Sequence, residues 1–125
     1  MVLREETNSK LQKILDIDNM LDVQWWLYKS ILSRQPMNSK YYKDWFKLYK
    51  TFYEIIEKLD NDSISDFEAA AEINKFLPKL MESKRALYEV LDYELKSSLD
   101  SVITKLVDGI NSIKDILEGK IDERI

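Results

Sequence analysis

Two pairs of carboxylates at three-residue spacing are the side chains in this sequence best suited to chemistry. Glu54 and Glu57 form the first pair, and Glu89 and Asp92 form the second. Residues three apart share one face of a helix, and two such pairs facing each other could hold Mg²⁺ for phosphoanhydride hydrolysis. On a helix over 39–60, however, Glu54 and Glu57 extend a lysine-rich side that points away from the apolar side. We therefore expect no shared metal cleft and predict that the protein is not an enzyme, with no catalytic residue, metal ligand or cofactor.

The composition removes most other catalytic groups. The 125 residues include no cysteine and no histidine. Disulfides, thiolate nucleophiles, cysteine-ligated metal centres and histidine general bases are therefore excluded. Carboxylates, lysine and tyrosine would have to carry any reaction, which makes an enzyme the least favoured class of function.

Segment 24–59 combines positive charge with aromatic residues. It holds seven basic and three acidic residues, together with ten of the fourteen aromatic residues of the chain. Lysines that neutralise phosphates beside rings that stack on bases are typical of proteins that bind single-stranded nucleic acid. The alternative is that the rings form the core of the fold and the lysines form its solvated face. The candidate nucleic-acid patch consists of Lys29, Arg34, Lys40, Lys43, Lys47 and Lys50.

The same segment also predicts a protein interface. On a helix over 39–60, apolar residues fill roughly half of the circumference, more than one flank of a small bundle usually covers. Trp25 and Trp26 are adjacent and point about 100° apart, so one can face the core while the other faces a neighbouring helix or a partner. The alternative is a central helix that its own chain encloses on three sides. The candidate interface consists of Trp25, Trp26, Tyr42, Trp45, Tyr49 and Tyr53, since tryptophan and tyrosine are frequent interface anchors.

The elements that position these residues are predicted to be helices. Apolar residues recur at three- and four-residue spacing without sustained alternation, and the chain has only two glycines and two prolines to form turns. We predict an all-α fold, a compact antiparallel bundle of four to five helices in a single domain over 1–125. The expected helices span about 8–34, 39–60, 65–77, 79–97 and 98–118.

Several residues predict where these helices begin, bend or end. Ser65 and Glu68 fit a capping box, and Gly119 fits a C-terminal cap. A break is possible within 16–19. Pro36 should end its helix and Pro78 should end or kink its helix, because proline disfavours helical geometry around itself. A four-residue step between two heptad-like stripes predicts a further break near Ser97, and Gly109 predicts a soft point in the last helix.

The last predicted helix carries a regular apolar seam. Spacings of four and three alternate along it, as in a coiled coil. The seam could pack within the bundle or pair with a copy of itself or a partner helix, and its shortness favours packing within the bundle. Its residues are Leu99, Ile103, Leu106, Ile110, Ile113 and Leu117.

These patterns favour one function and leave one alternative. The longest apolar run has four residues, over 25–28, and residues 1–6 lack the layout of a secretion signal, so we expect a cytoplasmic protein without a membrane partner. The leading hypothesis is a non-enzymatic protein-interaction or assembly protein that acts as a homo-oligomer or a small adaptor subunit. Its partner would be a protein. The alternative is a helical module that binds nucleic acid or nucleotides through 24–59.

Overall fold

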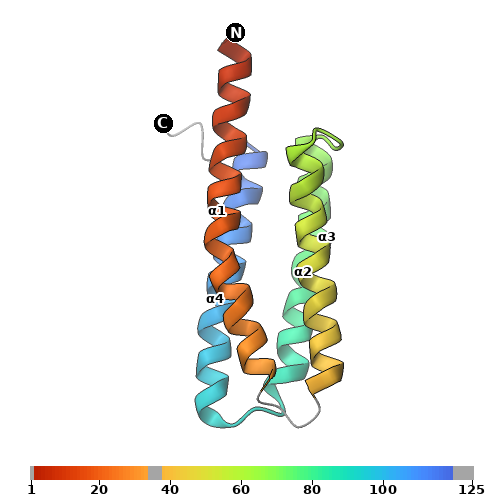
Figure 1. The fold of residues 1–125 in the computed structure, drawn as a ribbon, viewed down its shortest axis with the longest axis vertical. Helices are drawn as coiled ribbons and strands as arrows, with labels where there is room; N and C mark the ends of the chain where they lie inside the picture. Colours follow the sequence, from red (N-terminus) through yellow and green to blue (C-terminus); the bar gives the residue numbers. More distant parts are fainter. Residues whose placement is uncertain (1, 34–37, 120–125) are drawn as a thin grey trace.

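Four antiparallel helices make up the fold (Figure 1). The computed structural model describes the backbone of residues 2–33 and 38–119, and within these the side chains of residues 9–33 and 40–119. The helices are α1 (Val2–Leu32), α2 (Asn38–Asp60), α3 (Asp66–Tyr88) and α4 (Tyr93–Leu117). The α2–α3 loop lies at one end of the bundle and the α3–α4 turn at the other (Figure 1). The prediction of an all-α antiparallel bundle is confirmed, with four helices.

The helices pack in a ring around one core. Each neighbours the helices before and after it in the chain, and α1 also packs along α4. Rings of Trp25, Phe52 and Phe76 bring α1, α2 and α3 together, with 5.5 Å between the centroids of Phe52 and Phe76. The predicted seam of α4 faces this core, and its members are all buried. The seam is therefore used inside the bundle.

Helix α1 runs without a break through residues 16–19, where the sequence suggested one. Ile14 and Leu21 lie on either side of this stretch and are both buried, so helical geometry is required across it. The Asp16 carboxylate accepts a hydrogen bond from Gln12 Nε2 at 2.9 Å, one turn earlier. Because α1 is continuous here, neither Asp18 nor Asn19 caps a new helix start. Pro36, the predicted end of this helix, lies outside the described residues.

Helix α3 continues through Pro78, so the predicted end at residue 77 is wrong. Phe76 and Leu80 flank the proline on the core side and are 1% and 0% exposed. Burying both requires the helix to continue, and this packing outweighs the cost of about 3 kcal/mol for an interior proline. Pro78 cannot donate a hydrogen bond to the backbone carbonyl of Asn74. Both residues are exposed, so water can bind that carbonyl instead.

The break between the last two helices lies at 89–92, and the predicted boundary at Ser97 and Ser98 is wrong. Asp92 is the N-cap of α4, and its carboxylate accepts a hydrogen bond from the Leu95 backbone N–H at 3.0 Å. Leu91 is buried at the turn and anchors it against the core. The four-residue step between Leu95 and Leu99 falls inside α4.

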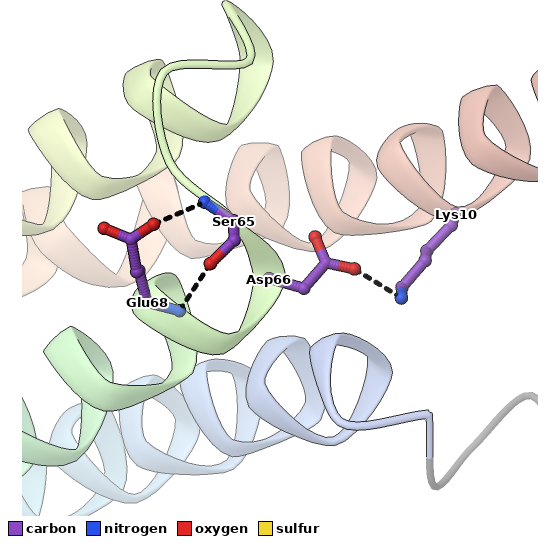
Figure 2. A network of polar contacts seen from close by, with 4 residues as sticks. All are labelled: Lys10, Ser65, Asp66 and Glu68. Carbon is purple, nitrogen blue, oxygen red and sulfur yellow. Dashed lines mark hydrogen bonds and ion pairs between the residues drawn. The ribbon is translucent and has the colours of Figure 1, made fainter.

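Two predicted caps are confirmed. The Ser65 hydroxyl accepts from the Glu68 backbone N–H at 3.1 Å, and the Glu68 carboxylate accepts from the Ser65 backbone N–H at 3.3 Å (Figure 2). Beside this capping box, Lys10 of α1 forms a 2.6 Å ion pair with Asp66, which ties α1 to the start of α3 (Figure 2). Gly119 follows α4 with a φ of 77°, a conformation that favours glycine.

Within the described residues, no helix has the length and apolar character needed to cross a lipid bilayer.

Candidate functional site

Trp25 and Trp45 fix α1 against α2 and so determine which aromatic residues stay outside. The indole N–H of Trp45 donates to the backbone carbonyl oxygen of Trp25 at 3.0 Å, and the two residues are 5% and 1% exposed. The Trp45 ring stacks on Tyr49 with 5.3 Å between centroids, and Trp25 meets the same tyrosine edge-on at 5.7 Å. Both tryptophans are core residues, so they lie behind the candidate interface and do not form part of its surface.

Trp26 points away from its neighbour, as the angle between adjacent helical residues predicts. Its side chain is 62% exposed. The Lys29 ammonium lies over the Trp26 ring at 4.4 Å from the centroid, over Tyr42 at 5.2 Å and over Trp45 at 5.4 Å. A cation over aromatic faces is attracted by the ring quadrupoles. Lys29 therefore bridges the rings of α1 and α2 at the surface.

A stripe of rings on α2 continues this surface. Tyr42, Phe46, Tyr49 and Tyr53 follow at spacings of four, three and four, which places them on one side of the helix. Phe46 and Tyr53 are 52% and 53% exposed, and Tyr42 is at the margin of exposure, whereas Tyr49 is partly buried. We call these four residues together with Trp26 the aromatic face.

An open hollow of about 520 Å³ lies along the aromatic face on α2. Phe46, Tyr49 and Tyr53 supply its apolar wall, and Lys50 with two glutamates supplies a charged rim. The glutamates are Glu54 and Glu57. The hollow therefore has an apolar wall and hydrogen-bonding groups at its rim. This arrangement suits the side chains of a protein partner.

Helix α1 adds apolar side chains beside Trp26. Met20, Val23 and Leu27 are all exposed and follow each other at spacings of three and four, and Leu27 also borders a hollow between α1 and α4. Of the twelve large apolar side chains that are exposed in the described part of the chain, seven lie between residues 20 and 53. Single exposed apolar residues are common on proteins, but such a concentration on two neighbouring helices is typical of an interaction surface.

Carboxylates stand at one end of the aromatic face. Burial, and secondarily the negative charge of Asp22, raises the pKa of Asp18 to about 6. Burial also raises the pKa of Asp22. The pKa of the Tyr49 hydroxyl is raised by burial and then by the charges of Asp22 and Asp18, so these carboxylates act on the α2 stripe. The face thus carries negative charge where α1 passes Tyr49.

The lysines of the predicted nucleic-acid patch do not share one surface. Lys40, Lys43, Lys47 and Lys50 are exposed along α2, and none forms an ion pair within the described residues. Lys40 and Lys47 border a groove between α2 and α3 that also holds Asp44 and Glu82. Lys29 and Lys50 lie beside the aromatic face instead, whereas Arg34 falls outside the described residues. The patch is therefore divided between two surfaces.

The two carboxylate pairs lie far apart along the bundle. Glu54 and Glu57 are in the last two turns of α2, near the α2–α3 loop, whereas Glu89 and Asp92 belong to the turn at the other end (Figure 1). Asp92 is also occupied as a helix cap. Among the side chains that the structure describes, no three or more possible metal ligands come together. The shared magnesium cleft is not formed.

Part of the aromatic face escaped the sequence prediction. Phe46 is not among the predicted interface residues, and the sequence pattern does not mark Asp18 as a charged neighbour of the rings. Met20, Val23 and Leu27 could have been found, because they repeat at helical spacing on a side of α1 that does not include Leu21. A second apolar stripe on the same helix is the sequence signal for an exposed apolar surface.

No protein-family model, curated protein or solved structure matches this chain.

Proposed function

We propose that this chain is a non-enzymatic, cytoplasmic protein-interaction module, and that the aromatic face is where its partner binds. The observation that carries the proposal is the exposure of Trp26, Phe46 and Tyr53, each more than half accessible on two adjacent helices. Tryptophan and tyrosine supply much of the binding energy of protein interfaces because they bury a large area with few rotatable bonds.

The energetic scale supports this role. Burying the exposed half of one such ring removes on the order of 100 Å² from water, which contributes about 2–3 kcal/mol before the costs of association. The three rings therefore offer a gross gain of about 6–9 kcal/mol on one surface. The bundle beneath them is fixed by the Trp45 indole bond to Trp25, so little ordering of the face is needed on binding.

The charges around the rings favour a protein over a nucleic acid. Asp18, Asp22, Glu54 and Glu57 stand beside the aromatic face together with Lys29 and Lys50. A phosphate backbone that stacked its bases on these rings would meet four carboxylates. A protein surface can instead match both signs at once.

Site-specific photo-crosslinking in the source cells tests the proposal. A photoreactive phenylalanine analogue is placed at Phe46, and the matched control carries it at Tyr93, which is 87% exposed at the start of α4. We expect a discrete protein adduct from position 46 and none from position 93. Adducts from neither position, or only from position 93, would contradict the proposal.

Nucleic-acid binding through α2 is the second candidate. The observation that favours it is the row of exposed lysines, Lys40, Lys43, Lys47 and Lys50, without ion-pair partners among the described residues. Titration with labelled single-stranded and double-stranded DNA at low and moderate salt tests it. Binding that strengthens at low salt and weakens in Lys43→Glu/Lys47→Glu would support it, because phosphate contacts release counterions. No binding at low salt would exclude it.

A further inference from the structure

We infer that the partner of the aromatic face is a second copy of this chain, bound antiparallel across a two-fold axis perpendicular to the bundle. This assignment rests on the proposed protein-binding role of the face. It follows from the order in which charges and rings succeed one another along α1 and α2.

The aromatic face has a basic end. Lys29 lies three residues from the end of α1, and Lys43 lies in the second turn of α2, so both stand toward the α3–α4 turn. Lys29 contacts the Tyr42 ring there at 5.2 Å from the centroid. Lys43 is exposed and has no ion-pair partner within the described part of the chain.

The opposite end of the face is acidic. Asp18 stands eleven residues before Lys29 on α1, a separation of about 16 Å along the helix axis. On α2, Glu54 and Glu57 line the far side of the hollow beyond Tyr53, so this hollow has two carboxylates against the single ammonium of Lys50. The Asp18 carboxylate, like Lys43, has no ion-pair partner among the described residues.

The rings occupy the space between the two ends. Tyr42 and Trp26 stand at the basic end, where both rings lie under the Lys29 ammonium, and Phe46 precedes Tyr53 toward the acidic end. A two-fold axis through the middle would place the basic end of each copy over the acidic end of the other and Tyr42 over Tyr53. A parallel arrangement would set like charges against each other. The face is therefore complementary to itself in the antiparallel orientation, as an isologous dimer requires.

The exposed rings provide about half of the area that each partner buries in such a dimer. Four partly exposed rings provide on the order of 400 Å² of apolar area, and the charged rim and Val23, three residues before Trp26 on α1, extend it. A stable interface buries about 800 Å² per partner with an apolar centre and a polar rim. The aromatic face supplies both parts.

Sedimentation equilibrium of the full chain with two charge-reversal variants tests the inference. Lys29→Glu/Lys43→Glu makes both ends of the face acidic, and Glu54→Lys/Glu57→Lys adds lysines to the acidic end. We expect the unmodified chain to dimerise, each variant alone to dimerise at least about tenfold more weakly, and an equimolar mixture of the two to form a heterodimer. The matched control, Lys75→Glu/Lys105→Glu, changes the net charge as much as the first variant but on exposed lysines of α3 and α4, and it should dimerise normally.

Circular dichroism checks that each variant is folded. Association in the mixture is a second check, because a heterodimer can form only if both variants are folded. A monomeric unmodified chain at several hundred micromolar would overturn the inference. So would variants that dimerise as tightly as the unmodified chain, or a control that is impaired equally. If the chain is monomeric but position 46 crosslinks to a different protein, the dimer is refuted while the proposed function stands. If position 46 captures no protein, the proposed function fails as well.

Discussion

Gly109 of α4 lies against the side chain of Leu21 on α1. A β-carbon at position 109 would lie 2.5 Å from Cδ2 of Leu21 and 3.2 Å from its Cγ. Leu21 is 4% exposed and is held on its other sides by the core. The glycine thus permits close packing of the two helices, and α4 continues through it without a break.

Gly109→Ala should destabilise the fold although alanine favours helix by about 1 kcal/mol. The clash with Leu21 should outweigh that gain, so we expect a net loss of about 1–2 kcal/mol in urea denaturation. In a Leu21→Ala background, which itself costs about 2–5 kcal/mol, the added methyl has space and should be neutral or stabilising. Additive effects of the two substitutions would refute the packing role of Gly109.

Pro78→Ala should stabilise the protein by about 2 kcal/mol. Alanine restores the backbone N–H that bonds the carbonyl of Asn74 and removes a steric clash, and the position is exposed, so no cavity forms. The gain is smaller than the full cost of an interior proline because proline also restricts the unfolded chain. The midpoint of urea unfolding should rise with an unchanged slope. An unchanged or lower midpoint would mean that α3 needs the proline.

Asp18 should make stability depend on pH in the weakly acidic range. Burial raises its pKa from 3.8 to about 6, so between these values the folded chain binds a proton that the unfolded chain does not. Stability therefore falls as the pH rises from about 4 to about 6 and loses nothing further from this group above that range. Asp18→Asn replaces the titratable carboxyl group by an amide. Between acidic and neutral pH, the melting temperature of this variant should change by a few degrees less than that of the unmodified chain.

Thermal unfolding of Asp18→Asn and of the unmodified chain at about pH 4.5 and about pH 7.5 measures the difference. Asp16→Asn is the matched control, because it makes the same change on an exposed residue of α1. Equal pH dependence in Asp18→Asn and the unmodified chain would show that Asp18 titrates at its ordinary pKa.

Truncating a buried ring of α2 should lower stability, whereas truncating an exposed ring should mainly weaken partner binding. Phe52 is 1% exposed, and Phe52→Ala should cost about 3–5 kcal/mol of stability. Phe46→Ser removes a ring that is half exposed and should cost no more than about 1 kcal/mol while weakening partner binding. Urea denaturation with the crosslinking or sedimentation assay separates the two effects. If the Phe46→Ser variant binds its partner as well as the unmodified chain does, this ring is not part of the interface.

The helical fold could be predicted because apolar spacing reports burial directly. The seam of α4 and the capping box at Ser65 depend on local pattern alone, and both are confirmed. The boundaries at Pro78 and Ser97 could not be placed from local rules. The packing of Phe76 and Leu80 keeps α3 helical through the first position. The real boundary lies at 89–92, where Glu89 ends α3 and Asp92 caps the start of α4, with no glycine or proline between them.

The candidate site was only partly predictable for a related reason. Periodicity shows that α2 is aromatic over a wide arc, but the packing of α1 decides which rings are covered. The indole of Trp45 turns inward to the carbonyl of Trp25, and this leaves Phe46 on the outside. A single sequence shows helix faces but not the neighbour that each face meets.

Hydroxyl-radical footprinting of the chain in its source cells and of the purified chain at high dilution tests the central claim most directly. Mass spectrometry reads oxidation at Trp26, Phe46 and Tyr53, with exposed Phe67 and Tyr93 as internal references. We predict that the three residues of the aromatic face are protected in cells and reactive at high dilution, while the references react equally in both. Equal oxidation of the aromatic face in the two samples, or protection only at Phe67 and Tyr93, would contradict a protein-binding role for this surface.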